Sequence, residues 1–417
     1  MSRSDAPTAA AGALPSDQAD RRARAAALAC MVGLAVVLGV GRFAFTPLLP
    51  LMLADGSIGL KAGGWLASAN YAGYFAGAVS CAALRVAPAR MVRFGLAATV
   101  LLTAAMGIGH PLPVWLAVRF VAGVVSAWTF VFMSQWGLRR LAELHAPEWS
   151  GVIYAGPGVG IVLTGLIGSA LAGRPAASGW LGFAALSAVL SVAIWRTFAV
   201  TPAQAVPPAG TTPHAASAAS AASAAPADAR RHRADAAWLV VLYGTPGFGY
   251  IITATFLPVI ARTALPAGSP WPDLFWPMFG AALIVGAIAA ARLPGHWDNR
   301  LLLAAGCATQ ALGIAAGIVW PNALGFSVGS ALLGLPFTAI TLFAMREARR
   351  LHGERAAGLM GYATASYGVG QIIGPLVAAP LAARFGSFSP ALWVAVAALL
   401  AGAAGFAAIA AKGRLRR

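Results

Sequence analysis

The string "GVGRFAFTPLLP" (residues 39–50) puts a charged residue, Arg42, inside a long apolar run. The string "GFGYIITATFLP" (residues 247–258) repeats its frame 208 residues later: Gly-x-Gly, seven residues, then Leu-Pro. An apolar run of about 20 residues is long enough to cross a lipid bilayer as a helix. A charge in the middle of such a helix costs about 2.5–3.5 kcal/mol on insertion scales. The surroundings of Arg42 therefore have to compensate its charge.

The composition is that of an all-α integral membrane protein. The chain has 417 residues, of which 59% are hydrophobic and 10% charged, and its mean hydropathy is +0.76. Soluble proteins carry about 25% charged residues. The net charge of +17 does not indicate a nucleic-acid partner, because the basic residues form short clusters between apolar runs. The predicted surroundings are a lipid bilayer.

Cysteine and histidine give no sign of a metal site or a catalytic site. Cys30, Cys81 and Cys307 all lie inside apolar runs, and no histidine is paired with a cysteine or an acid at metal-ligand spacing. No nucleophile–base arrangement is visible either. We therefore expect no metal, no cofactor and no enzymatic activity.

Apolar runs predict twelve membrane-spanning helices. They lie near residues 25–53, 62–84, 91–109, 112–138, 150–172, 179–199, 237–261, 271–291, 300–319, 323–345, 357–382 and 390–411. Residues 200–236 differ, because they are rich in Ala, Pro and Ser and have no apolar face, which indicates a flexible linker. The predicted division is a disordered tail (1–24), a six-helix bundle (25–199), the linker (200–236), a second six-helix bundle (237–411) and a basic tail (412–417).

The basic residues predict the orientation. Of the 29 Lys and Arg residues, 23 fall on the side of the two chain ends and the linker. The opposite side carries only Lys61, Arg174, Arg262 and Arg384. Connections rich in Lys and Arg stay on the cytoplasmic side of a membrane. Both termini are therefore predicted to be cytoplasmic.

Two further pairs of strings support an internal repeat. Gly158-Val-Gly160 recurs as Gly368-Val-Gly370, and "RRL" at 139–141 recurs at 349–351, both at an offset of 210. Together with the first pair, these are three matches at one near-constant offset. They predict that the two halves are duplicates with the same internal order of helices.

Two parallel six-helix halves joined by a long connection are typical of the major facilitator architecture. "RFVAGVVSA", which begins at Arg119, resembles the fourth-span motif of that superfamily. "GVIYAGPGVG" (151–160) resembles its fifth-span motif, and "GVGQIIGP" (368–375) echoes it. The resemblance covers residues 25–411, and "GRFAFTPLLP" further resembles a subfamily of bacterial permeases of the YbfB/YjiJ type. It implies a multi-pass transporter of the bacterial inner membrane that works by alternating access, and we expect a monomer.

Motif residues other than the arginines are interpreted as packing or gating residues. The loop after span two usually carries an acid in this superfamily, but here it has Arg85 and Arg90 and no acid, so Asp298 and Arg300 of the equivalent second-half loop join them as inner-gate candidates. The small and helix-breaking residues of the spans are assigned to helix packing and conformational change. They are Gly39, Gly41, Gly123, Gly156, Pro157, Gly158, Gly160, Gly247, Gly249, Gly368, Gly370, Gly374 and Pro375.

Arg42 and Arg119 are intramembrane cations, and none of the twelve acidic residues lies at mid-membrane. Asp55 and Asp273 come closest, near the outer ends of spans one and eight. Water, carbonyl groups and aromatic faces, or a bound anion can each compensate such a charge. The resemblance favours an anion at Arg42, because some superfamily members bind organic anions with a basic residue in span one. Both arginines are candidate substrate ligands, with a structural role as the alternative.

Further polar side chains at helical spacing complete the candidate substrate site, and ordinary interhelical hydrogen bonding is the alternative interpretation. They are Thr46, Asn70, Tyr74, Tyr250, Thr253, Thr364, Tyr367 and Gln371. The preferred function is secondary transport of a small organic anion. One alternative is export of lipophilic or cationic drugs, which the lack of mid-membrane carboxylates disfavours. The other is a non-transporting membrane sensor, although no string resembles a signalling domain.

Overall fold

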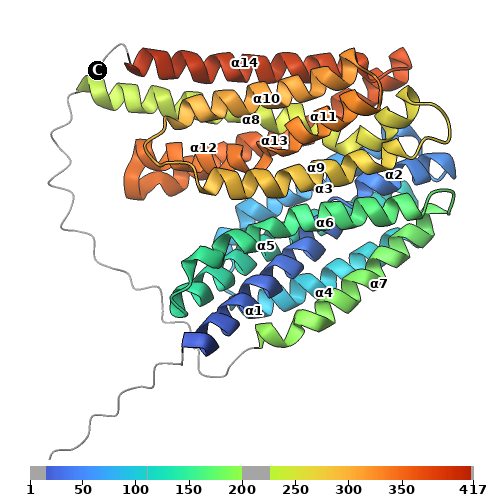
Figure 1. Ribbon diagram of the computed structural model, residues 1–417, viewed down its shortest axis with the longest axis horizontal. Coiled ribbons are helices and arrows are strands. Elements are labelled where there is room, and N and C mark those ends of the chain that lie inside the picture. The colour runs from blue at the N-terminus through green and yellow to red at the C-terminus, as the bar shows by residue number, and fades with distance from the viewer. Residues whose placement is uncertain (1–15, 110, 200–225, 415–417) are drawn as a thin grey trace, which may run out of the picture.

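The computed structural model describes residues 16–109, 111–199 and 226–414, and these residues form two bundles of long helices (Figure 1). The first bundle consists of α1 (Ser16–Leu34), a π-helical segment (Ala35–Val40), α2 (Phe45–Ala54), α3 (Leu60–Ser80), α4 (Pro88–Met106), α5 (Leu112–Glu143), α6 (Ser150–Ala170) and α7 (Ala176–Trp195). The second consists of α8 (Pro226–Ala264), α9 (Trp271–Ala291), α10 (Asn299–Val319), α11 (Ala323–Gly334), α12 (Phe337–His352), α13 (Ala357–Phe385) and α14 (Ser389–Arg414). All twelve predicted spans are present, with spans one and ten each interrupted.

Two helices begin earlier in the sequence than predicted. Residues 16–24 belong to α1 and not to a disordered tail, and residues 226–236 belong to α8 and not to the linker. Both segments are rich in Ala and Arg, which favour helix outside the bilayer as well as inside it. Arg24 also donates to Asp20 one turn earlier, at 2.7 Å. The rest of both predicted segments, 1–15 and 200–225, and residues 415–417 of the basic tail lie outside the described residues.

Eleven helical stretches of the described chain are long and apolar enough to cross a membrane. The remaining span, α3, falls below that hydropathy because it packs against α5 of its own bundle and α13 of the other. A Cβ atom at Gly73 would come within 1.9 Å of the Phe120 carbonyl oxygen of α5. A helix that faces protein on two sides can carry small and polar residues that a lipid-facing helix cannot.

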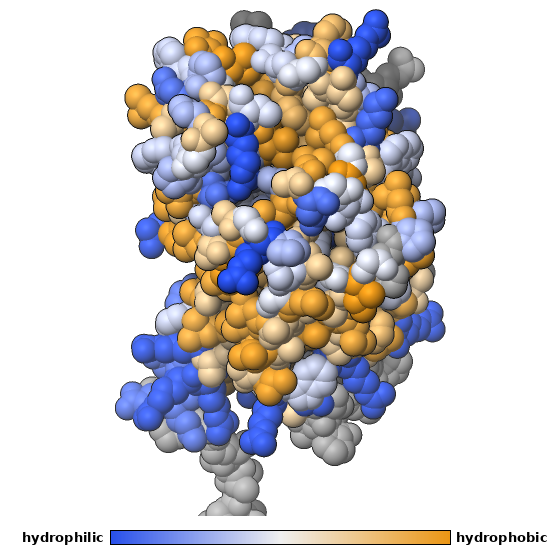
Figure 2. All heavy atoms as spheres, turned by 90° about the vertical axis from the view of Figure 1, so that its right-hand side faces the viewer, coloured by the Kyte–Doolittle hydropathy of each residue, from blue (hydrophilic) through white to orange (hydrophobic). Residues whose placement is uncertain are grey.

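The two bundles approach each other unequally along their length. We call the end at which α1 begins and α14 ends the terminal end, and the opposite end, with residues 55–59, 171–175 and 265–270, the far end. Figure 1 shows the bundles side by side toward the far end and spread apart toward the terminal end. Figure 2 looks onto the far end, where hydrophobic side chains are interspersed with hydrophilic ones.

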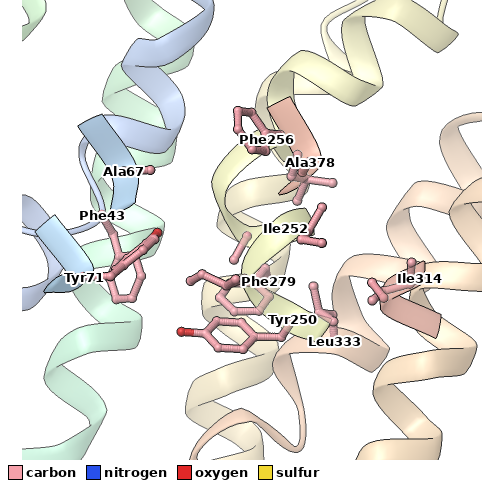
Figure 3. Close-up of a cluster of buried hydrophobic side chains, with 14 of the residues drawn as sticks. Phe43, Ala67, Tyr71, Tyr250, Ile252, Phe256, Phe279, Ile314, Leu333 and Ala378 are labelled. Carbon is pink, nitrogen blue, oxygen red and sulfur yellow. The ribbon is translucent and has the colours of Figure 1, made fainter. Parts of the chain in front are cut away.

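Buried side chains follow the same division. One hydrophobic cluster runs from α2 and α3 into the second bundle and includes Phe43, Tyr71, Tyr250 and Phe279 (Figure 3). A second cluster, around Met133, belongs to the first bundle alone and lies toward its terminal end. The bundles therefore share a core toward the far end, whereas the first bundle keeps a core of its own at the terminal end.

Glycines of the repeated strings lie where helices come closest. A Cβ atom at Gly39 would approach the Cα of Gly160 to 2.4 Å, and one at Gly247 would approach the Tyr367 carbonyl oxygen to 2.3 Å. These contacts join equivalent helices of the two halves, span one to span five and span seven to span eleven. The structure thus places the repeated glycines at matching helix crossings, and their role in conformational change stays a prediction.

Candidate functional site

Span one is interrupted immediately before Arg42. Residues 35–40 are π-helical, with Gly41 N donating to Val36 O at 2.9 Å and Phe43 N to Leu38 O at 3.1 Å. Isolated π turns inside α-helices are rare and frequently mark functional sites. The helical repeat is therefore broken at the one arginine that the opening string contains.

The interruption leaves two backbone carbonyl groups without their usual donors. Pro47 has no N–H for the Phe43 carbonyl, and Thr46 N bonds to that oxygen instead, at 3.2 Å. As a result, Thr46 N does not reach the Arg42 oxygen, and no backbone N–H of the described chain is hydrogen-bonded to the Gly41 oxygen either. Unpaired carbonyl groups inside a membrane protein are costly, so another donor has to serve them.

Arg119 of α5 is that donor. Its guanidinium lies 3.4 Å from the Gly41 oxygen, 3.3 Å from the Arg42 oxygen and 3.4 Å from the Leu66 oxygen of α3. It also lies over the Phe45 ring, 4.9 Å from the ring centre, and only 2% of the residue is exposed. Arg119 therefore holds the broken backbone of span one against α3 and α5.

Arg42 is surrounded quite differently. Its Nη2 donates to Gln371 Oε1 of α13 at 2.9 Å, whereas its Nε is buried without a hydrogen-bond partner. The guanidinium lies over the rings of Tyr74, Tyr71 and Phe43, at 4.1, 5.1 and 5.3 Å from their centres. Aromatic faces attract a cation but do not neutralise it. Arg42 is thus a buried charge held by one neutral acceptor and three rings.

Acidic residues are engaged elsewhere. In the described part of the chain, the carboxylates that form ion pairs do so near the helix ends: Asp20, Glu143, Asp273, Asp298 and Glu347 each pair with a nearby arginine other than Arg42. Asp55 instead accepts hydrogen bonds from Ser57 and from the Ala176 N–H. Asp273 lies near the outer end of its span and was therefore a possible partner of Arg42, but it accepts a hydrogen bond from Arg262 instead.

Gln371 connects the two halves at Arg42. Its amide oxygen accepts from Arg42, and its amide nitrogen donates to the Tyr250 hydroxyl of α8. Tyr250 lies at the position equivalent to Arg42 in the repeat, and its ring stacks on Tyr367 with 5.9 Å between centres. Figure 3 shows the Tyr250 hydroxyl directed toward Tyr71 and Phe43 of the first bundle.

Three further hydrogen bonds join the bundles. Thr46 donates to the Ala254 oxygen at 2.9 Å, Ser68 donates to the Ile372 oxygen at 2.8 Å, and the Tyr71 and Thr255 hydroxyls lie 3.0 Å apart. Thr46 follows Arg42 by one turn toward the far end. Ser68 and Tyr71 likewise precede Tyr74 on α3, which runs from the far end to the terminal end. Among the hydrogen bonds between the bundles in the described chain, those of the layer of Arg42, Tyr74 and Gln371 are therefore nearest the terminal end.

The structure brings only some of the predicted site residues together. Tyr74, Tyr250, Tyr367 and Gln371 gather around or next to Arg42, as described above. Thr46 belongs to the contact between the bundles, and substrate contact by Arg119 remains an untested prediction. The remaining three residues have other surroundings: Asn70 donates to the Arg119 oxygen at 2.9 Å, Thr364 donates to Met360 of its own helix at 2.8 Å, and Thr253 lines a small apolar cavity with Leu257 and Ile314.

Two residues near Arg42 were missed by the sequence prediction, Phe43 and Tyr71. Tyr71 precedes Tyr74 by three residues, so helical spacing already placed the two rings on one face. Phe43 also contacts Trp276 of the second bundle, with 5.9 Å between ring centres.

The inner-gate candidates lie apart at the terminal end. Arg300 bonds to Asp298 at 2.9 and 3.0 Å, and its nearest other carboxylate oxygen is that of Glu347 at 3.9 Å, all within the second bundle. Burial alone would raise the pKa of the Asp298 carboxyl, but the hydrogen bonds from Arg300 outweigh it and hold the pKa below its usual range. Arg85 and Arg90 are exposed, and among the described residues neither contacts the second bundle through a hydrogen bond or ion pair.

Comparisons with known proteins agree with this architecture. The family model described as "Uncharacterised MFS-type transporter YbfB" matches residues 34–407. The search of curated proteins gives no match. Among solved structures, the nucleoside transporter NupG is similar with a TM-score of 0.70 and 11% identity, over 93% of this chain and 98% of that one.

Two further structures show the same fold. The D323A mutant of NupG has a TM-score of 0.69 and 14% identity, over 92% of this chain and 99% of that one. A D-xylose–proton symporter has a TM-score of 0.67 and 11% identity, over 92% and 97%. Identities this low show the fold alone. The family match covers nearly the whole chain, and the chain therefore belongs to the MFS-type transporter family of YbfB.

Proposed function

We propose that this transporter moves a small organic anion and that Arg42 is its anion ligand. The observation that carries the proposal is the buried guanidinium of Arg42, which has an unpartnered Nε and no carboxylate partner among the described residues. A buried charge without a counter-ion costs several kcal/mol. A substrate carboxylate would remove that cost when it binds, which makes binding at this point selective for anions.

The guanidinium suits a carboxylate in particular. Arg presents a planar fork of N–H groups that two carboxylate oxygens can meet together. In the described state one arm of the fork is on Gln371, so an entering carboxylate would compete with the Gln371 oxygen for Nη2 and also satisfy Nε. Phosphate esters are less favoured, because the second buried arginine, Arg119, already donates to three carbonyl groups.

Alternating access follows from the position of this layer. The hydrogen bonds between the bundles run from Arg42 toward the far end, so the anion would approach from the terminal end, where the bundles diverge (Figure 1). Binding would loosen the Arg42–Gln371–Tyr250 connection between the halves. The contacts of Thr46, Ser68 and Tyr71 would then have to open for release at the far end.

The orientation belongs to the same proposal. The chain ends and the connections on the side of the terminal end contain 23 of the 29 basic residues of the sequence, which supports a cytoplasmic location of this end in the inner membrane. Reporter fusions after residue 215 and at the C-terminus should then both report the cytoplasm. A periplasmic signal from either fusion would contradict the orientation.

The function is tested by a thermal-shift screen of the purified protein. Carboxylates, phosphate esters, amino acids, nucleosides, sugars and cationic drugs are compared at equal ionic strength, since a bound ligand stabilises the folded state by mass action. We expect stabilisation by one or more carboxylates. Stabilisation only by cationic or only by neutral compounds would overturn the assignment of an anion. The same series on Arg42→Gln shows whether the effect depends on this residue.

A further inference from the structure

A second basic site lies at the terminal end of the second bundle, away from the contact between the halves. A cavity of about 990 Å³ is bounded by the connection from α9 to α10, the start of α10 and the end of α12. Its size falls in the range of small-molecule sites, about 300–1,000 Å³. Its lining includes four arginines, Arg300, Arg346, Arg349 and Arg350, and His296.

Two of the four arginines are neutralised. Arg350 bonds to both oxygens of Glu347, at 2.6 and 2.8 Å, and Arg300 bonds to both oxygens of Asp298. Both arrangements are the paired-oxygen geometry that holds a guanidinium firmly. Asp298 and Glu347 are therefore already paired, each with an arginine that is held in place.

The other two arginines carry uncompensated charge. Arg346 has its Nη1 buried without a hydrogen-bond partner, and Arg349 is exposed. Neither forms an ion pair with any acid that the structure describes. Among the described residues, these two guanidinium groups therefore have no carboxylate partner, whereas Arg300 and Arg350 have one.

The equivalent place in the first bundle is built differently. The string "RRL" at 349–351 repeats 139–141, so Arg139 is the counterpart of Arg349. Arg139 and Arg140 both bond to Glu143, at 2.9 and 3.0 Å, and the positions equivalent to Asp298 and Glu347 are Pro88 and Gly137. The first half therefore lacks this pair of arginines, because Trp136 is the counterpart of Arg346 and the counterpart of Arg349 is paired with Glu143.

We propose that this cavity binds a phosphate-bearing anion through Arg346 and Arg349. A phosphate group presents three oxygens and a charge that suits two guanidinium groups. Two sources share this chemistry, an anionic phospholipid headgroup and a soluble phosphate compound. Trp297 at the rim is 48% exposed, and an aromatic residue at that depth is common where a chain meets lipid headgroups.

The first arm of the test uses inorganic phosphate. The melting temperature of the protein in a neutral detergent is measured over a phosphate titration, with chloride at matched ionic strength as the reference. We expect phosphate to raise it, and the double variant Arg346→Gln/Arg349→Gln to need about tenfold more phosphate for the same shift. Arg349→Gln alone changes only an exposed side chain and should give a smaller loss. Arg139→Gln is the matched control and should behave as the wild type.

The second arm uses lipid. The protein is exchanged into phosphatidylglycerol or phosphatidylcholine, and native mass spectrometry counts the lipids that each variant retains. Retention of phosphatidylglycerol that the double variant loses supports the site and identifies a headgroup as the ligand. A phosphate shift without such retention supports a soluble ligand. If neither arm distinguishes the double variant from Arg139→Gln, the proposal is wrong.

Arg42 is a second place where phosphate could bind, so Arg42→Gln is measured in the same series. A phosphate shift that Arg42→Gln keeps belongs to the cavity. A shift that Arg42→Gln loses and the double variant keeps belongs to the substrate site and overturns the cavity proposal. The two proposals can therefore fail separately.

Discussion

Arg42 and Arg119 are two buried arginines of one bundle with opposite surroundings. Arg119 donates to three backbone carbonyl groups of its own bundle, whereas Arg42 donates to one side chain of the other bundle and keeps an unpartnered Nε. One of the carbonyl groups that Arg119 holds is that of Arg42 itself. Burial of a charge therefore does not define its role. The role follows from which of its donors remain free.

The two arginines also depend on each other. The π-helical segment turns Arg42 out of the regular helical repeat and exposes the Gly41 and Arg42 carbonyl groups, which Arg119 then satisfies. Arg119 is in this account a positioning residue, and Arg42 presents the charge. Variants of the two residues should therefore separate stability from ligand binding.

The largest expected effect is on stability, in Arg119→Gln. The shorter side chain cannot reach three carbonyl groups, and a buried group left unsatisfied costs about 1–3 kcal/mol. We expect a loss of about 3 kcal/mol, seen as a lower melting temperature and a lower yield of purified protein. Arg119→Lys keeps the charge but not the fork and should recover only part of the loss. A variant Arg119→Gln as stable as the wild type would remove the distinction between the two arginines.

The next largest loss of stability is expected from adding a methyl group at Gly39, where the π-helical segment packs closely on α6. In Gly39→Ala the new methyl group would lie 2.4 Å from the Gly160 Cα, a backbone atom that cannot rotate away. Overpacking of this kind costs about 1–3 kcal/mol, and transport should fall because Arg42 is displaced. Gly182→Ala in α7 is the control, since its Cβ meets open space. Equal behaviour of both variants in melting and transport would show that the segment tolerates displacement.

A smaller change in stability with a large change in transport is expected from Gln371→Glu. The new carboxylate would pair with Arg42, and a charged hydrogen bond contributes about 1.5–3 kcal/mol, in part offset by desolvation of the carboxylate. The empty protein should be as stable as the wild type or more so, while anion binding is lost. Gln371→Leu, which adds no charge, should keep anion binding. Unchanged anion binding in Gln371→Glu would place the substrate away from Arg42.

The smallest effects are expected from the acids closest to mid-membrane. Asp55 bonds to Ser57 and the Ala176 N–H in the first bundle, and Asp273 bonds to Arg262 in the second. Neither acid is part of the layer around Arg42, so Asp55→Asn and Asp273→Asn should each keep substantial transport in reconstituted vesicles. Abolished transport by a correctly inserted variant would make that acid a coupling group and would add a proton relay to the mechanism.

Much of the fold could be predicted from hydropathy and the repeat, because twelve apolar runs and a near-constant offset are visible in the order of the residues alone. The helix extensions before residues 25 and 237 could not be predicted in this way, because a helix outside the bilayer does not have to be hydrophobic. The π-helical segment could not be predicted either. Gly39, Arg42 and Thr46 share one helix face only if span one keeps a regular 3.6-residue repeat, and hydrogen bonds from residue i to i−5 leave no trace in the sequence.

The candidate site was predicted only in part, and the reason is chemical. Hydroxyl groups of Thr and Ser can be satisfied by a carbonyl one turn earlier in their own helix, as Thr364 is by Met360. A polar residue on the correct face is then not available to a ligand. Gln371 and Tyr74 have longer side chains, which extend to Arg42. Length of the side chain, which spacing alone ignores, separates the two groups.

The most direct test of the central claim is a paired measurement on Arg42→Gln. The melting temperature of the empty protein and the shift caused by a carboxylate that stabilises the wild type are recorded together, with Arg42→Lys as the conservative variant. The account predicts an empty protein that is as stable as the wild type, a lost shift in Arg42→Gln, and an affinity about tenfold weaker in Arg42→Lys. A destabilised empty protein with an unchanged carboxylate shift would contradict it and leave Arg42 as a packing residue.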